Sequence, residues 1–265
     1  MEIVTELVAN EKEIIPLKER IKTAIPSKNG LFPHEILALH YAPTFYINQD
    51  VFQEFWKSYS VLEVDKVLSS LLSRGFLKIG TFEDVLKIQK SDRLKIILKT
   101  NDLSSSGKKE NLIKTILDKI QHTELDKLFP NKTYSLTDTG TEELKNGEYI
   151  VYVHRHGFEG LDIWTLNKRV DVTPHRYRDK IWQYLNMDLS RKYLSKGDFG
   201  LYRNLRYTMS RFLNEEKKFK GELALLTEVM FCDLSGLSNN YDKSYFIICS
   251  DSFFRELYTS FTLSP

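Results

Sequence analysis

Apolar and polar positions recur at helical spacing along most of the chain, and clusters of turn-forming residues separate the periodic segments. In its first third the pattern predicts helices at residues 3–24, 34–41, 49–59 and 63–74. The expected apolar face of the third helix is Val51, Phe52, Phe55 and Trp56. Gly75 ends the fourth helix.

Two short strands are expected, one at residues 76–79 and one at residues 132–136. A helical segment, TEELKN, follows the second strand, and Thr137 or Asp138 is placed to cap it. This order of helices, strands and closing helix resembles a winged-helix domain. The resemblance implies that the two strands pair as the wing. We expect residues 1–80 and 130–147 to form this winged-helix-like domain, with residues 81–129 inserted as a module with its own fold.

The insertion carries the most specific motif in the chain, at residues 91–117. The segment resembles the SAP family, which has two short helices separated by a tight turn. The patterned positions are Leu94, Leu98, Asn101, Leu103, Ser104 to Ser106, Gly107, Lys108, Lys109, Leu112, Ile113, Ile116 and Leu117. Asn101 stands where Gly is commoner in the family, and Asn tolerates the left-handed conformation that ends many helices.

The motif predicts a small two-helix core and an anion site. The core is expected to contain Leu94, Leu98, Leu103, Leu112, Ile113 and Ile116. Residues 104–107 place backbone N–H groups at the start of the second helix, where the helix dipole favours an anion. Lys108 and Lys109 add positive charge at the same place. Such a site binds a phosphate without reading base edges.

The SAP resemblance implies DNA binding, with a preference for AT-rich duplex. The expected contacts are Ser104, Ser106, Gly107, Lys108 and Lys109, extended by Arg93, Lys95 and Lys99 on the first helix. The alternative is a polar turn with a solvated lysine pair. The presumed recognition helix, residues 63–74, offers Lys66 and Arg74 as secondary candidates and lies in an acidic stretch. That domain either binds DNA or serves as a scaffold or dimer surface.

Residues 148–265 are expected to form a mostly helical C-terminal domain. The apolar run 149–153 fits a strand or a buried helix, because its periodicity does not distinguish them. The His154-Arg155-His156 segment after it fits a metal-ligand pair or two structural histidines.

Beyond Pro174, helices are expected over residues 176–194, 199–219 and 221–237. Residues 168–220 hold 14 Lys and Arg against 6 Asp and Glu, and the arginines alternate with aromatic residues. Such arginines either bind phosphates beside stacking aromatics or cover the surface of a helical bundle. The secondary DNA-binding candidates here are Arg176, Arg178, Arg203 and Arg206.

Composition narrows the class of protein. With 42% hydrophobic and 28% charged residues, the chain has the composition of a folded protein rather than a disordered one. The net charge is +2, but the charges are unevenly distributed along the chain. Two basic blocks, residues 87–127 and 168–220, are separated by an acidic block. Cys232 and Cys249 are too few for a disulfide framework. Without an apolar segment or an export signal, we expect a cytoplasmic protein with no membrane partner.

No phosphate-binding glycine loop, nucleophile elbow or zinc-protease helix is found, so an enzyme is the less favoured interpretation. We expect a mainly α fold with a small β wing and a DNA-binding function in regulation or in chromosome maintenance. Neither a cofactor nor a metal is expected. The alternatives are a nuclease-like enzyme tethered by the SAP module and a protein-assembly factor. The expected partners are duplex DNA, bound with little base specificity, and a protein or a second copy bound through the C-terminal helical domain.

Overall fold

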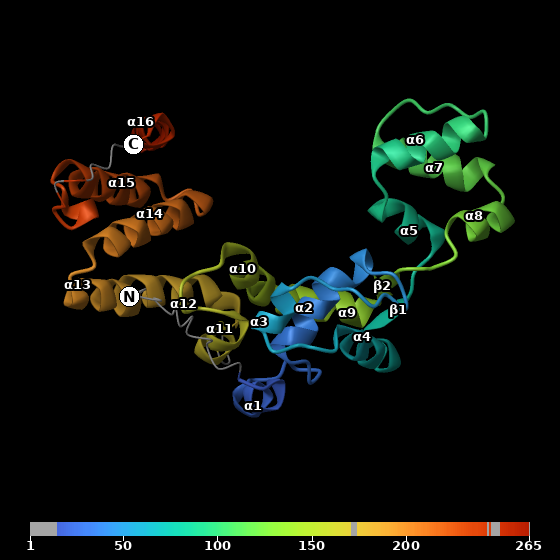
Figure 1. Ribbon diagram of the computed structural model, residues 1–265, viewed down its shortest axis with the longest axis horizontal. Coiled ribbons are helices and arrows are strands. Elements are labelled where there is room, and N and C mark those ends of the chain that lie inside the picture. The colour runs from blue at the N-terminus through green and yellow to red at the C-terminus, as the bar shows by residue number, and fades with distance from the viewer. Residues whose placement is uncertain (1–14, 171–173, 243, 245–249, 265) are drawn as a thin grey trace, which may run out of the picture. The chain divides into compact units, whose positions relative to one another are not determined.

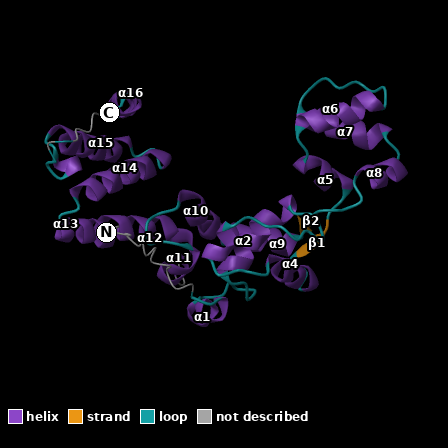
Figure 2. Ribbon diagram, in the orientation of Figure 1, coloured by secondary structure: helices purple, strands orange, loops and turns teal. Residues whose placement is uncertain are grey.

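The computed structural model describes residues 15–170, 174–242, 244 and 250–264. The fold is mainly helical with one small two-stranded antiparallel sheet, as the hydrophobic pattern predicts (Figure 2). The chain divides into two compact units, residues 1–175 and residues 176–265. Within the described residues no helix combines the length and the apolar character needed to cross a membrane.

The first unit is built around helix α2 (Figure 1). This helix is buried along nearly its whole length. Its elements outside the insertion are α1 (Leu17–Thr23), α2 (Pro33–Tyr41), the 3₁₀ turn η1 (Ala42–Thr44), α3 (Phe55–Ser58), α4 (Val64–Ser73), β1 (Leu77–Ile79), β2 (Tyr134–Leu136), α9 (Asp138–Asn146), α10 (Glu148–His156) and α11 (Ile163–Val170). Helices α4, α9, α10 and α11 all contact α2. Residues 3–14 of the expected leading helix lie outside the described residues.

The two predicted strands pair with each other. Leu77 lies opposite Leu136 and Ile79 opposite Tyr134 in the antiparallel register. Thr137 then caps α9, since its hydroxyl accepts a hydrogen bond from the backbone N–H of Gly140 at 3.1 Å. A β-carbon on Gly140 would lie 2.1 Å from the backbone oxygen of Phe76, so only glycine lets the helix start so close to β1.

Two expectations for this unit, a helix and a domain boundary, are corrected, and one open alternative is decided. Of the helix expected at residues 49–59, only the single turn α3 forms. Only Trp56 of its four expected apolar residues is buried, and Val51 is 74% exposed. The run 149–153 is helical and belongs to α10, which buries Ile150 and Val153. Because α10 and α11 pack on α2, the C-terminal unit begins near residue 176 and not at the expected boundary of 148.

The insertion forms four helices with a hydrophobic core of their own. They are α5 (Phe82–Ile88), α6 (Ser91–Thr100), α7 (Lys109–Lys119) and α8 (His122–Leu128), and α6 and α7 lie side by side (Figure 1). The core includes Leu86 from α5, Leu98 from α6, Ile116 from α7 and Leu125 from α8, each fully buried.

Within the described residues of the C-terminal unit, all regular elements are helices. Its elements are the 3₁₀ turn η2 (Pro174–Arg176), which crosses the boundary, α12 (Tyr177–Gln183), a π-helical segment η3 (Tyr184–Leu189), α13 (Ser190–Lys196), α14 (Phe199–Glu215), α15 (Phe219–Leu234), the 3₁₀ turn η4 (Leu237–Asn239) and α16 (Asp251–Leu263). Helices α14 and α15 pack along each other, and α16 packs on α15. Cys232 is a buried free thiol, and Cys249 lies outside the described residues.

Candidate nucleic-acid interface

Helices α6 and α7 bury the residues that the motif assigns to its core. Leu94, Leu98, Leu112 and Ile116 are at most 1% exposed, and Ile113 is 7% exposed. Leu103, in the connecting loop, packs against this cluster while remaining partly exposed. The spacing of these apolar residues therefore holds the two helices together and fixes where the loop between them begins and ends.

The loop leaves α6 through a left-handed residue, one position later than expected. Asn101 has φ −103° and ψ 17°, and its side-chain amide donates to the carbonyl oxygen of Ile97 at 3.0 Å. Asp102 takes the left-handed conformation instead, with φ 53°. At the other end of the loop Gly107 has φ 110°, which strongly favours glycine at this position.

The start of α7 has unused hydrogen-bond donors. No side chain caps this helix, and within the described chain none of the backbone N–H groups from Ser106 to Glu110 donates a hydrogen bond. Ser104 and Ser106 are exposed, and their hydroxyl oxygens lie 3.1 Å apart. The dipole of the eleven-residue helix α7 adds partial positive charge here, so the site is suited to an anion such as a phosphate.

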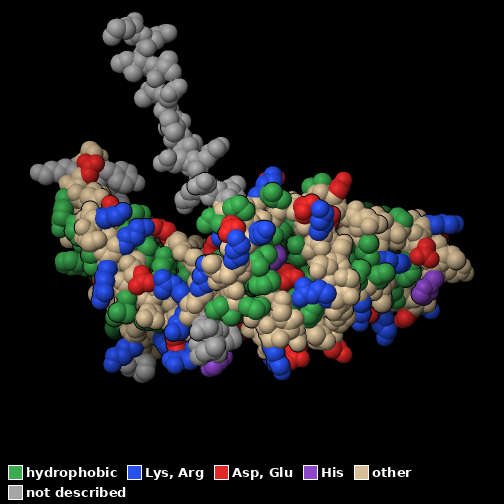
Figure 3. All heavy atoms as spheres, turned by 90° about the horizontal axis from the view of Figure 1, so that it is seen from below, with side chains coloured by type: hydrophobic (Ala, Val, Ile, Leu, Met, Phe, Trp, Pro, Cys, Tyr) green, Lys and Arg blue, Asp and Glu red, His purple; other side chains and the backbone are tan. Residues whose placement is uncertain are grey.

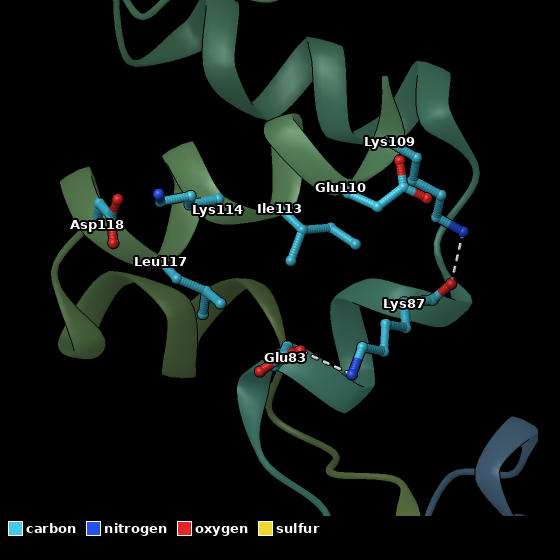
Figure 4. Close-up of a pocket in the computed structure, with 8 residues that line it drawn as sticks. All are labelled: Glu83, Lys87, Lys109, Glu110, Ile113, Lys114, Leu117 and Asp118. Carbon is cyan, nitrogen blue, oxygen red and sulfur yellow. Dashed lines mark hydrogen bonds and ion pairs between the residues drawn. The ribbon is translucent and has the colours of Figure 1, made fainter. Parts of the chain in front are cut away.

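The two lysines of the motif are in different environments. Lys108 is exposed at the N-terminal end of α7, and its ammonium makes no contact with another described residue that would neutralise it. The ammonium of Lys109 instead donates a hydrogen bond to the backbone oxygen of Lys87, at the end of α5, at 2.5 Å (Figure 4). Lys109 thus links α7 to α5. Of the two lysines, only Lys108 is exposed without such a contact.

A cavity of about 570 Å³ lies between α5 and α7, next to Lys109 (Figure 4). Ile113 and Leu117 form its apolar wall. Three lysines and three acidic residues line the rest: Lys87, Lys109, Lys114, Glu83, Glu110 and Asp118. Because these charges balance, the cavity does not favour an anion, and the anion site remains at the start of α7.

The basic residues predicted on α6 also differ from one another. Arg93 donates to the side-chain oxygen of Gln89 at 2.8 Å, and its guanidinium lies 5.1 Å from the ring centre of Phe129. Arg93 therefore helps to hold the module together. Lys95 and Lys99 lie one turn apart on α6 and form no ion pair with a described residue, so both are free to meet a phosphate.

The basic candidates on and just after α4 are paired with acids. Lys66 forms an ion pair with Glu63. Arg74 forms one with Glu35 at 2.5 Å, and its guanidinium lies 5.2 Å from the ring centre of Phe76. Both cations are thus partly neutralised before any ligand arrives.

Ion pairs also hold the four arginines of the C-terminal unit that were predicted as secondary DNA contacts. Arg203 makes a two-pronged pair with the buried carboxylate of Asp233, at 2.8 and 2.6 Å. The remaining pairs are Arg176 with Asp179, Arg178 with Glu215 and Glu216, and Arg206 with Glu228. Burial tends to raise the pKa of Glu216, but hydrogen bonds from Lys218 and Arg178 outweigh it and lower that pKa. Arg178, Arg203 and Arg206 thereby link neighbouring helices of the unit, whereas the pair of Arg176 with Asp179 is exposed and lies within one turn.

The histidines considered as metal ligands lie on α10, and His154 is satisfied by two tyrosines. The hydroxyls of Tyr41 and Tyr59 lie 2.8 Å from its two ring nitrogens. Burial lowers the pKa of His154, and nearby Arg155 lowers it further. Burial, with smaller effects of Asp162 and Tyr41, raises the pKa of Tyr59 to about 12. Among the described residues, no three His, Cys, Asp or Glu side chains are grouped to hold a metal ion.

Two features of the site were missed at the sequence level. Helices α5 and α8 complete the core of the module, although the capping box of Thr81 and Asp84 before Val85 and Leu86 could have indicated α5. Lys114, exposed on α7, is a further cation of the module, and its position on the polar side of the helix was the available signal.

Comparisons of the chain with protein-family models, with curated proteins and with solved structures find no significant match.

Proposed function

We propose that the protein binds duplex DNA and that residues 81–129 supply the main contact, as a SAP-type module inserted in a winged-helix-like domain. The observation that carries this proposal is the uneven pairing of the basic residues. Lys95, Lys99 and Lys108 form no ion pair with any described acid, whereas the candidate arginines of the C-terminal unit are all paired. Unpaired lysines can release the counterions that surround DNA, and a paired arginine must first lose its own partner.

The proposed contact is made to the phosphate backbone. Backbone N–H groups at the start of α7 and the ammonium of Lys108 are donors suited to one phosphate, and Lys95 and Lys99 are suited to its neighbours. None of these groups has the planar two-pronged geometry that distinguishes one base from another. We therefore propose affinity with little sequence preference, and a scaffold role for the part of the domain around α4, where Lys66 and Arg74 are paired. A role in regulation or in DNA maintenance inside the cell fits this mode of binding.

Single-lysine variants test the proposal. Fluorescence anisotropy would measure the affinity of the full chain for labelled AT-rich and GC-rich duplexes of equal length. Lys108→Ala is expected to weaken binding to both duplexes roughly tenfold, because one charge-assisted contact is lost. Lys109→Ala is expected to change it less than about twofold, since that ammonium already binds the oxygen of Lys87.

Lys145→Ala is the matched control, because Lys145 is an exposed helical lysine on α9, outside the insertion. Circular dichroism would confirm that each variant keeps its helical content. Equal affinities for Lys108→Ala and Lys145→Ala in folded proteins would remove the start of α7 from the interface.

A further inference from the structure

A cavity of about 350 Å³ lies in the first unit, beside the loop that joins α1 to α2. Its walls come from that loop, from Ile36 on α2, from the junction of α9 with α10, and from Asn167 on α11. Lys28 and Asn146 are exposed and mark its mouth. Glu143 and Asn167 are 1% and 3% exposed and mark its inner end. The volume is near the lower end of the range for small-molecule sites.

The wall that the loop contributes is held in place by hydrogen bonds. The side-chain oxygen of Asn167 accepts from the backbone N–H of Ile25 at 2.8 Å, and its amide donates to the backbone oxygen of Ile25 at 3.0 Å and to the hydroxyl of Tyr149 at 2.9 Å. The hydroxyl oxygen of Ser27 accepts from the backbone N–H of Leu31 at 3.0 Å. The cavity is therefore formed before a ligand arrives, which reduces the ordering cost of binding.

Glu143 is a buried acid that has no cation beside it. Its Oε1 accepts a hydrogen bond from the side-chain amide of Asn29 at 2.7 Å, whereas its Oε2 is buried and has no hydrogen-bond partner among the described residues. Buried acids are normally paired, because a carboxylate that leaves water loses its hydration without compensation. The second oxygen of Glu143 therefore needs a donor that the described chain does not provide.

The surroundings of Glu143 favour a cation as that donor. Residues 146–147 at the C-terminal end of α9 line the cavity, and the helix dipole gives this end partial negative charge. On the face of the molecule shown in Figure 3, basic and acidic side chains are interspersed, so that face selects neither sign of charge. The preference for a cation comes from Glu143 and from the end of α9.

Lys28 at the mouth determines what the other end of the ligand carries. It lines the cavity, is exposed and forms no ion pair with a described residue. A ligand with positive charge alone would be repelled there, whereas an acid group would be attracted. The side chains of Ile25, Pro26 and Ile36 also line the cavity and suit an apolar stem.

We propose that the first unit binds a small zwitterion, such as a free basic amino acid, whose guanidinium or ammonium group pairs with Glu143 and whose acid group pairs with Lys28. The apolar side chains of the wall contact the stem between the two charged groups. Asn29 keeps its hydrogen bond to Oε1, and the ligand donates to Oε2. The proposal does not involve the insertion and holds whether or not that module binds DNA.

Isothermal titration calorimetry of the full chain with free amino acids tests the site. L-Arginine and L-lysine present the two kinds of cation, and at least one of them is expected to bind with a Kd below about 1 mM. L-Citrulline, which has an uncharged urea group in place of the guanidinium, is expected to bind at least about tenfold more weakly. Agmatine, which lacks the carboxylate of arginine, is expected to bind about threefold more weakly, because Lys28 then has no acid to pair with.

Conservative variants test the two charged residues. Glu143→Gln keeps an oxygen for Asn29, and it is expected to weaken binding of the basic amino acid at least about tenfold and to remove the preference over citrulline. Glu142→Gln is the matched control, because Glu142 is exposed on the same helix, and it is expected to leave binding unchanged. Lys28→Ala is expected to weaken the binding of arginine and to leave that of agmatine unchanged. Circular dichroism would confirm that each variant keeps its helical content.

Three results would contradict the proposal in different ways. No binding of either basic amino acid at about 10 mM, or equal affinities of wild type and a folded Glu143→Gln, would overturn it. Equal affinities for the basic amino acids and citrulline would show that the cavity does not select a cation. Equal effects of Lys28→Ala on arginine and agmatine would overturn the pairing of the acid group with Lys28.

Discussion

Replacing His34 by Phe is expected to remove a large part of the acid sensitivity of the first unit. The imidazole is 4% exposed on α2, stacks on Trp164 at a ring-centre distance of 5.4 Å, and has no described hydrogen-bond partner for Nδ1. Burial, with a smaller effect of the Arg74 charge, lowers the pKa of His34 from 6.5 to about 4. The folded protein therefore keeps this histidine neutral at pH values where the unfolded chain protonates it.

The sign and size of the effect follow from the two pKa values. Between pH 6.5 and 4 the unfolded state binds a proton at His34 that the folded state does not, so acidification favours unfolding. The part of the unfolding free energy that depends on a neutral His34 is therefore present in full above pH 6.5, and it is lost progressively as the pH falls to about 4. A difference of about 2.5 pKa units corresponds to about 3 kcal/mol in total, of which about 2 kcal/mol is lost between pH 7 and pH 5.

Urea unfolding at pH 7 and pH 5, followed by tryptophan fluorescence, measures this loss. Wild type is expected to lose about 2 kcal/mol more than His34→Phe over that interval, while the two proteins differ little at pH 7 because the ring keeps its stacking partner. An NMR titration of the His34 ring protons measures the folded pKa directly. A folded pKa near 6.5, or the same pH dependence in both proteins, would refute the argument.

Further predictions concern the packing of each unit. Gly140→Ala is expected to cost about 3 kcal/mol of unfolding free energy, because the new methyl group meets the backbone oxygen of Phe76; urea unfolding measures it, and a cost below about 1 kcal/mol would contradict the described contact. Asp233→Ala is expected to cost about 3–5 kcal/mol by leaving the guanidinium of Arg203 without its buried partner. The double variant Arg203→Met with Asp233→Leu is expected to recover most of that loss, and a double variant as unstable as the single one would show that the ion pair itself is required.

Most helices and strands were predictable because the residues that determine them lie close together in the sequence. The spacing of Leu94, Leu98, Leu112 and Ile116 predicts α6 and α7 directly, and Thr137 marks the start of α9. The run 149–153 could not be assigned, since five consecutive apolar residues have no period. Only its packing against α2, a segment more than 100 residues away, decides for a helix.

The candidate site was less predictable, because it depends on contacts between distant parts of the chain. Arg178 meets Glu215 and Glu216, which lie 37 and 38 positions further along the chain. Lys109 reaches the backbone oxygen of Lys87, 22 positions earlier. A motif identifies a basic residue. Which acidic side chain or carbonyl oxygen binds that residue depends on how whole helices pack. The structure therefore separates free lysines from paired arginines, which the sequence presents as equivalent.

The salt dependence of DNA binding tests the central claim most directly. The affinity of the full chain for one duplex would be measured over a series of salt concentrations, for wild type, for the triple variant Lys95→Ala, Lys99→Ala and Lys108→Ala, and for Arg176→Ala. The account predicts that the triple variant lowers the slope of log affinity against log salt by roughly 2–3, about 0.9 for each lost phosphate contact, and that Arg176→Ala leaves it unchanged. A slope that the triple variant does not alter, or that Arg176→Ala lowers as much, would contradict it.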